Sequence, residues 1–213
     1  SLNSLSYAKR KTEELGVKNI EYIQGNILDL ETMGKKFDII ECVGVLHHMA
    51  NPLEGWATLV NCLKPSGLMK IGLYSELARK NIIRIRQLIS KDNIPATKDA
   101  MILFRSDLIK ENNIDSKALK GSIDFFSTSA FRDLLFHVQE HRFTIYQVID
   151  ALQKLNLFFA GFEFANETVL RQFVSAHSKS EELYDLNVWA KYEELNPRTF
   201  AGMYQFWVQN CRQ

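Results

Sequence analysis

Two adjacent histidines, His47 and His48, are the residues of this sequence best suited to proton transfer. They follow the apolar run FDIIECVGV at residues 37–45 and precede a predicted helix that begins after Asn51. An imidazole titrates near neutral pH, so a histidine at the end of a buried strand can orient a substrate or act as a general base. One ring capping the next helix explains the same residues equally well. The first hypothesis makes both histidines candidate catalytic residues.

A second short motif is Gly25 followed by Asn26, at the end of the segment NIEYIQG. Glycine lets the backbone approach a flat ligand closely, and the asparagine side-chain oxygen can accept a hydrogen bond from an exocyclic amine. A plain turn is the alternative interpretation. Ligands of open parallel sheets bind outside the carboxyl ends of the strands, and Gly44 stands where the chain leaves the next strand. These positions are therefore candidate binding residues.

The motif HVQEH, with His137, Glu140 and His141, matches the inverted zinc-peptidase pattern. On a helix the two histidines would share a face and could bind zinc, with the glutamate as base. The sequence offers no identifiable third ligand, and the flanking apolar residues have ordinary core spacing. We therefore predict no metal site and keep the peptidase as a distant third hypothesis. The favoured interpretation is a polar patch that includes Arg142 and is either hydrogen-bonded internally or faces substrate.

Composition narrows the class of protein. The 213 residues are 46% hydrophobic, enough for one domain with a substantial core. With 26 basic and 25 acidic residues the net charge is +1, which does not favour nucleic-acid binding. The odd set Cys42, Cys62 and Cys211 indicates reduced thiols. No membrane-length apolar run or export signal is found, so we expect a soluble cytoplasmic protein.

The order of predicted elements is that of an α/β fold. A surface helix, two strands, a helix and a third strand are predicted at residues 1–15, 19–27, 37–45, 51–63 and 68–74. The apolar run 37–45 is typical of a strand buried on both faces of a parallel sheet. This alternation of strands and helices predicts a doubly wound, mostly parallel, Rossmann-like sheet.

A helical insertion follows Tyr74 and is predicted to be a lid or substrate-recognition cap, because loops of such length are usually functional. Residues 76–90 mix basic and apolar side chains, which predicts an amphipathic helix on the sheet whose basic face can meet an anionic partner. A strand, two helices and a final edge strand are then predicted at residues 157–164, 167–176, 181–195 and 202–210. We divide the chain into a partial core (1–75), the lid (76–150) and the completion of the core sheet (151–213).

At this point the sequence resembles a family. The string FDIIECVGVLHHMANPLEGWATLVNCLKPSGLMKIGLYS resembles the fourth strand, following helix and fifth strand of class I S-adenosylmethionine-dependent methyltransferases. DFFSTSAFRDLLFHVQEHRFTIYQVIDAL and GMYQFWVQ resemble a bacterial subgroup often joined to tetratricopeptide repeats. The resemblance spans almost the whole chain and implies that the lid lies between the fifth and sixth family strands.

The resemblance implies S-adenosylmethionine as methyl donor, S-adenosylhomocysteine as product, and an unknown methyl acceptor. The implied mechanism is in-line attack by an acceptor oxygen, nitrogen or carbon on the sulfonium methyl. Tyr74 is then part of the pocket wall. The implied site residues are Gly25, Asn26 and Ile27 around the adenine, Val43, Gly44 and Val45 on the methionine side, and His47 and His48 facing the methyl-transfer pocket.

Two features depart from the family pattern. Asn26 stands where the family commonly has aspartate, and the family's first strand, its glycine-rich turn and the acidic residue ending the second strand would all precede Ser1. Backbone donors of a glycine loop cannot be replaced by side chains elsewhere. We therefore expect an N-terminally truncated enzyme, with a sheet incomplete in its N-terminal half and weak or absent cofactor binding. Its open strand edges would allow homodimerisation.

The alternative to an enzyme is a non-catalytic binding or assembly module on a degenerate methyltransferase fold. It would use aromatic side chains on the surface, and the candidates are Phe125, Phe126, Phe131 and Phe136. The same residues also have the spacing of an ordinary core.

Overall fold

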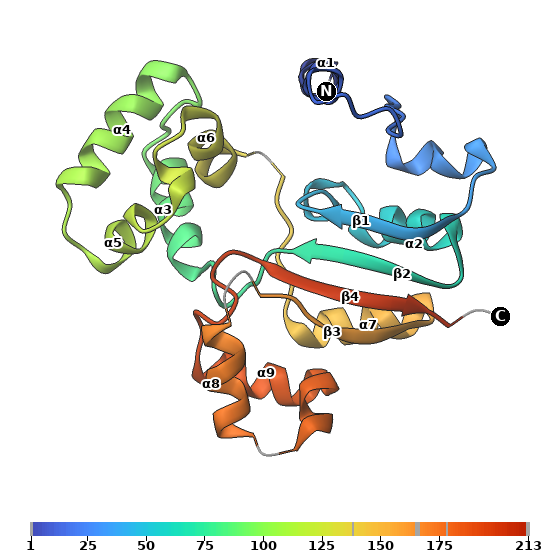
Figure 1. Cartoon of the computed structure of the whole chain (residues 1–213). Helices are drawn as coiled ribbons and strands as arrows, with labels where there is room; N and C mark the ends of the chain where they lie inside the picture. Colours follow the sequence, from blue (N-terminus) through green and yellow to red (C-terminus); the bar gives the residue numbers. More distant parts are fainter. Residues whose placement is uncertain (1, 138, 165–166, 178, 212–213) are drawn as a thin grey trace.

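The structure is a computed structural model that describes residues 2–137, 139–164, 167–177 and 179–211. Its centre is a four-stranded sheet in the order β1-β2-β4-β3 (Figure 1). The strands are β1 (Phe37–Val43), β2 (Leu63–Leu73), β3 (Leu157–Phe162) and β4 (Tyr204–Asn210). β1 pairs with β2 in parallel, and β4 runs antiparallel to both β2 and β3. Three strands share one direction, and the chain has the α/β, Rossmann-like fold that the sequence predicts.

The unit β1-α2-β2 follows from local signals. Helix α2 (Pro52–Cys62) begins at a proline, and the Asn51 side chain accepts a hydrogen bond from the Glu54 amide at 3.4 Å. Both features are typical of a helix start. β2 begins immediately after the helix, because Leu63 pairs with Phe37 ahead of an irregularity in the ladder. The strand is therefore longer at its start than predicted.

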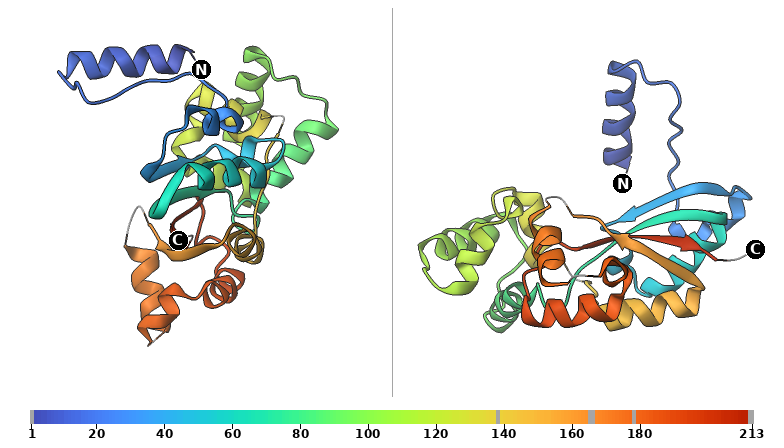
Figure 2. Two further views of the ribbon diagram at one scale, coloured as in Figure 1. Left: turned by 90° about the vertical axis from the view of Figure 1, so that its right-hand side faces the viewer. Right: turned by 60° about the horizontal axis from the view of Figure 1, so that its bottom comes forward.

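The main core lies between the sheet and the helices α2, α7 (Ile145–Leu155) and α9 (Leu186–Leu195), which cover one face of the sheet (Figure 2). Trp56 of α2 and Trp189 of α9 are both buried in this core, and each is 1% exposed. The Thr144 and Gln147 side chains form a reciprocal capping box at the start of α7. Such a box satisfies two backbone donors that the helix itself leaves unpaired.

Strand β4 is central rather than the predicted edge strand. It lies between β2 and β3 and is hydrogen-bonded to both. Tyr204, Phe206 and Val208 alternate along it and are completely buried on the face that the helices cover. The alternation was visible in the sequence, but alternation is compatible with either position.

Strand β1 is an edge strand, so the prediction that it is buried on both faces is wrong. Cys42 is its only buried residue, and Ile39 is 57% exposed. Among the described residues nothing pairs with its outer edge. The predicted strand at 19–27 is also not formed: Asn26 instead caps the short 3₁₀ helix η1 (Ile27–Met33) by accepting a hydrogen bond from the Leu28 amide. A strand needs a ladder partner, which that segment lacks here.

Four helices form a second cluster beyond the carboxyl ends of β1 and β2 (Figure 1). They are α3 (Lys80–Lys91), α4 (Lys98–Lys110), α5 (Ile114–Lys120) and α6 (Thr128–Phe136). This cluster has its own hydrophobic core, to which α3 contributes Ile85 and Ile89. The amphipathic helix predicted in 76–90 is formed as α3, but it packs on α5 and α6 and not on the sheet. The four helices lie within the predicted lid, whereas α7 joins the main core.

The aromatic residues of this region do not make a surface. Phe125, at the end of the short 3₁₀ helix η3 (Ile123–Phe125), is completely buried, and Phe131 is 1% exposed. Phe136 packs against the same core, and only Phe126, at 65% exposure, faces solvent. Of the four aromatic candidates of the non-catalytic alternative, Phe126 is therefore the one exposed to solvent.

The remaining helices flank this body. Helix α1 (Leu2–Glu14) has no buried residue and stands away from the sheet (Figure 2). The predicted helix at 181–195 is divided into η4 (Ser180–Tyr184) and α9, while α8 (Thr168–Ala176) is confirmed. Phe173 of α8 stacks on Trp189 at 3.6 Å between ring centroids. None of the helices in the described ranges has both the length and the apolarity needed to span a membrane.

Candidate functional site

A backbone segment crosses the carboxyl ends of β1 and β2, and we call residues 139–144 the strap. The His141 amide donates to the His47 carbonyl at 2.7 Å, and the Phe143 amide donates to the Tyr74 carbonyl at 2.8 Å. The Glu76 amide returns a bond of 2.9 Å to the Phe143 carbonyl. The strap thereby fixes the turn after β1 and the turn after β2 against each other.

An aromatic stack joins these turns. The rings of His47 and Tyr74 are stacked with centroids 3.9 Å apart and an interplanar angle of 28°. The guanidinium carbon of Arg79 lies 3.7 Å from the centroid of the same Tyr74 ring, a close cation–π contact. Tyr74 is thus held between a histidine from the β1 turn and an arginine from the β2 turn.

His47 is completely buried, and among the described residues neither ring nitrogen has a partner of hydrogen-bond geometry. Its pKa is lowered to about 4, mainly by burial and next by the neighbouring His48, while Glu140 and the Gly72 backbone oppose the shift. The imidazole is therefore neutral at physiological pH. A base with so low a pKa accepts protons weakly.

His48 follows His47 in the same short 3₁₀ helix η2 (Leu46–His48) but is only partly buried. Its Nδ1 lies 2.9 Å from the carbonyl oxygen of Gln139 in the strap, and its ring lies against His137 at 4.1 Å. A carbonyl can only accept, so Nδ1 carries the proton in this contact. In the neutral ring the Nε2 lone pair remains available.

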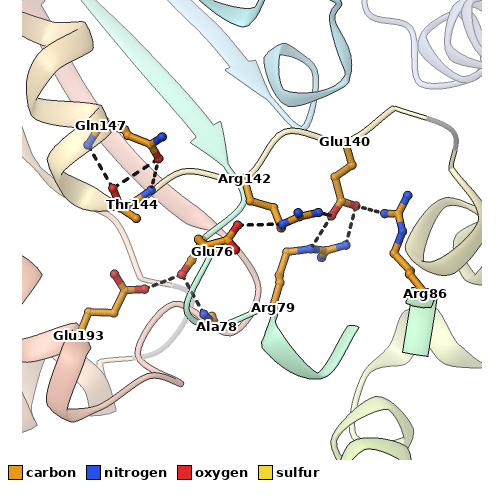
Figure 3. Close-up of polar contacts among 10 residues, drawn as sticks. Glu76, Ala78, Arg79, Arg86, Glu140, Arg142, Thr144, Gln147 and Glu193 are labelled. Carbon is orange, nitrogen blue, oxygen red and sulfur yellow. Dashed lines mark hydrogen bonds and ion pairs between the residues drawn. The ribbon is translucent and has the colours of Figure 1, made fainter. Parts of the chain in front are cut away.

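A buried carboxylate in the strap gathers three arginines (Figure 3). Glu140, 1% exposed, accepts two hydrogen bonds from Arg79, at 3.2 and 2.8 Å, and one from Arg86 at 2.8 Å. Arg142 is 3.5 Å from Glu140 and donates at 2.9 Å to Glu76. These contacts connect the strap, the β2 turn and helix α3. Within the predicted polar patch, Glu140 and Arg142 are hydrogen-bonded to each other, whereas His141 Nε2 has no hydrogen-bond partner among the described residues.

The zinc-peptidase motif does not have the geometry its hypothesis requires. Helix α6 ends at Phe136, and His137, Glu140 and His141 follow it in irregular structure. The two histidines therefore do not share a helix face, and the glutamate is occupied by arginines. Within the described residues no group of three or more histidine, cysteine or acidic side chains could hold a metal ion.

A second buried carboxylate supports the β2 turn from the other side. Glu193 of α9 accepts hydrogen bonds from Ser75 Oγ at 2.5 Å and from Tyr204 OH at 2.6 Å. The Ser75 hydroxyl also accepts from the Ala78 amide, and Figure 3 shows Glu193 and Ala78 beside each other at this turn. Burial raises the pKa of Glu193 despite these donors. The triad ties α9 and β4 to the turn that carries Tyr74 and Arg79.

A cavity of about 330 Å³ lies between these strand ends and the helical cluster, and we call it the strand-end cavity. Its floor includes Val43, Tyr74 and Arg79, and helices α3, α5 and α6 with the loop before β4 supply the other walls. Burial raises the pKa of Tyr74, so its hydroxyl is a neutral donor there. A volume of this size suits a small molecule.

The predicted cofactor residues fall into two separate places. Gly25, Asn26 and Ile27 line a cavity of about 460 Å³ beside β1, which we call the β1-edge cavity, whereas Val43 lines the strand-end cavity. Gly44 and Val45 follow Val43 in the turn, and neither cavity is lined by both groups. Gly44 has φ of 77°, and open space surrounds the position of a Cβ atom there.

Neither His47 nor His48 lines these two cavities; Tyr74 stands between His47 and the strand-end cavity in the stack. The lining residues that sequence reasoning missed are Arg79, Asp124 and Arg198. Arg79 belongs to the basic stretch at 76–90, but the sequence did not predict that this side chain lines a cavity. Asp124 and Arg198 carried no signal in the sequence.

Comparison with known proteins shows the family to which this chain belongs. A family model described as "Methyltransferase domain" matches residues 1–118. An uncharacterized protein from Synechococcus sp. is 25% identical over 205 residues, which cover 90% of this chain and 48% of that protein.

Two solved structures share the fold. PKMT2 from Rickettsia typhi has a TM-score of 0.66 at 15% identity, and PKMT2 in complex with AdoHcy has a TM-score of 0.68 at 17% identity. The matches cover 100% of this chain but only 44% and 43% of those chains. The chain thus spans less than half the length of these relatives.

Proposed function

We propose methyl transfer as the function of this chain, from the premise that it belongs to the methyltransferase-domain family, whose model matches residues 1–118 of the 213. The donor is S-adenosylmethionine, and the acceptor binds in the strand-end cavity. The observation that carries the proposal is that cavity, because it opens at the carboxyl ends of β1 and β2, where open α/β sheets bind their ligands.

The proposed donor contacts are those that the sequence suggested. Gly25, Asn26 and Ile27 would flank the adenine, and Val43, Gly44 and Val45 would line the methionine side. Two observations fit this: a ligand can approach the Gly44 backbone closely, and PKMT2, which has this fold, was solved in complex with AdoHcy. The Asn26 side-chain oxygen already accepts from Leu28, so it has one lone pair left for an exocyclic amine.

S-adenosylmethionine supplies an electrophilic methyl group when bound, and this chain positions the acceptor and removes its proton. Tyr74 and Arg79 orient the acceptor from the cavity floor. Of the two candidate bases, His48 is the better one, because Gln139 orients its ring and leaves Nε2 free. Since His48 does not line the strand-end cavity, proton transfer to it requires an acceptor that extends beyond that cavity. His47, neutral and buried, supports Tyr74 by stacking.

Because its two predicted parts line different cavities, we propose that the donor site of this chain alone is weak, with a dissociation constant on the order of 1 mM. The test is an NMR titration with S-adenosylhomocysteine of the unmodified chain and of Gly44→Val, which fills the space beside the backbone. Gly16→Val is the matched control, since Gly16 also has a positive φ, 71°, with open space around it.

We expect shifts in the unmodified chain and in Gly16→Val, and an affinity at least about tenfold lower in Gly44→Val, as removal of one close contact predicts. Equal affinity of all three proteins for S-adenosylhomocysteine would show that the donor does not bind against Gly44. If millimolar S-adenosylhomocysteine caused no chemical-shift change, the cofactor assignment would be wrong. The non-catalytic module would then be the better hypothesis.

A further inference from the structure

We propose that the methyl acceptor is a small molecule carrying a phosphate group, which is bound in a basic cavity that adjoins the strand-end cavity. This inference rests on the proposed methyl-transfer function and specifies the acceptor. The basic cavity has a volume of about 390 Å³ and lies between the start of α3, helix α5 and the loop that follows α9. Its lining includes four cationic side chains and no acidic one: Lys80, Arg84, Lys117 and Arg198.

The two cavities are adjacent. Ala78, Asn81, Ala118 and Arg198 line both of them. Tyr74 and Arg79 line the strand-end cavity, and the cations line the basic cavity. A molecule that spans both cavities would place its nucleophile at the strand ends and an anionic group among the cations.

Three of the four cations lack a counterion. Arg84 is the cation that has a counterion, because it donates to both carboxylate oxygens of Asp115. Within the described residues, the side chains of Lys80, Lys117 and Arg198 have no ion pair or hydrogen bond in the structure. By contrast, Arg79 and Arg86 on the same stretch of chain are bound by Glu140. Of the basic side chains in residues 76–90, Lys80 and Arg84 line the basic cavity, and both are exposed to solvent.

The start of α3 adds backbone donors at the same place. This helix has 12 residues, no side chain that caps its N-terminus and no acidic residue in its first turn. The first amides of a helix lack acceptors within it, and the helix dipole makes that end positive. Lys80 and Asn81, in the first turn, both line the basic cavity.

The number of donors favours phosphate over carboxylate. Two lysines, the planar fork of an arginine and a helix start offer more donors than two carboxylate oxygens can accept, whereas a phosphate has three or more oxygens. Asp124, the acidic residue in the lining of the strand-end cavity, does not line the basic cavity, and Asp115 beside that cavity is paired with Arg84.

The experiment measures binding of inorganic phosphate and of succinate by NMR titration at fixed ionic strength. The test variant is the double change Lys117→Gln and Arg198→Gln. The control is the double change Lys91→Gln and Lys98→Gln, which removes the same charge from the far end of α3 and the start of α4, outside the cavity. Each protein is also titrated with S-adenosylhomocysteine.

We expect phosphate to bind the unmodified chain and the control alike, and the test variant about tenfold or more weakly, because two charged contacts are lost. Succinate should bind more weakly than phosphate. Equal phosphate binding by test and control variants, or tighter binding of succinate, would overturn the proposal. If phosphate behaves as expected but S-adenosylhomocysteine fails to bind, the methyl-transfer function fails and with it the identity of the phosphate compound as an acceptor.

Discussion

His47 is the most isolated polar side chain of the site. It is fully buried, both ring nitrogens lack hydrogen-bond partners in the described part of the chain, and its ring stacks on the face of Tyr74. A buried polar group without a partner destabilises the fold, so it usually persists for a reason connected with function. Here the reason we infer is the orientation of Tyr74 in the strand-end cavity.

The pKa of His47 predicts how stability depends on pH. Above pH 6.5 the ring is neutral in the folded and the unfolded chain, so it contributes no pH dependence. Between pH 6.5 and about 4 the unfolded chain binds a proton that the folded chain does not, so the free energy of unfolding falls with falling pH. The loss has an upper limit of about 3 kcal/mol.

Urea denaturation at pH 7, 5.5 and 4 measures this loss. His47→Phe keeps an aromatic ring against Tyr74 but cannot titrate, so its stability should fall less over that range than that of the unmodified chain. Parallel curves for the two proteins would show that His47 does not carry the pH dependence.

At the scale of elements, Glu140 is the contact that joins the helical cluster to the sheet. It accepts from Arg79 in the β2 turn, from Arg86 in α3 and from Arg142 in the strap itself (Figure 3). The strap also bonds to both turns through its backbone. The position of α3 to α6 relative to β1 and β2, and so the shape of the strand-end cavity, depends on this carboxylate.

Glu140→Gln should therefore be strongly destabilising, by about 3–5 kcal/mol, because it leaves the 3%-exposed Arg79 without its anionic partner. Glu76→Gln is the matched control, since Glu76 is 42% exposed and pairs only with Arg142. Its loss should be at most about 1 kcal/mol, as is usual for exposed pairs. Urea unfolding measures both changes, and losses of similar size would contradict a central role for Glu140.

For the whole molecule, the outer edge of β1 is an exposed edge of the sheet. No described residue pairs with it, and Phe37, Ile39 and Val43 are 40%, 57% and 38% exposed. A strand edge with unpaired backbone groups and apolar side chains is a template for pairing with another chain. We therefore propose that this chain self-associates through β1.

Sedimentation velocity over a range of concentrations tests this proposal. Ile39→Lys should shift the population toward monomer, because a lysine on an edge strand opposes pairing. Leu103→Lys, at a 67% exposed position on α4, is the charge-matched control and should leave the association unchanged. A monomer at all concentrations, or equal effects of the two changes, would remove β1 as the interface.

The sequence by itself determined the features that a few neighbouring residues encode. Asn51 and Pro52 mark the start of α2, the alternation of Tyr204, Phe206 and Val208 marks a strand with one buried face, and the motif pattern of residues 37–75 indicated the fold family. Capping, periodicity and turn chemistry act over one or two turns of chain, so they can be read without the fold.

Only the tertiary structure decided which strand is central, where the basic side chains of α3 point and what surrounds each candidate residue. The deciding contacts join residues far apart in sequence: Arg79 and Glu140 are separated by 61 positions, His48 and Gln139 by 91, and Ser75 and Glu193 by 118. Burial and charge pairing depend on everything that packs around a group, and no local pattern records that environment.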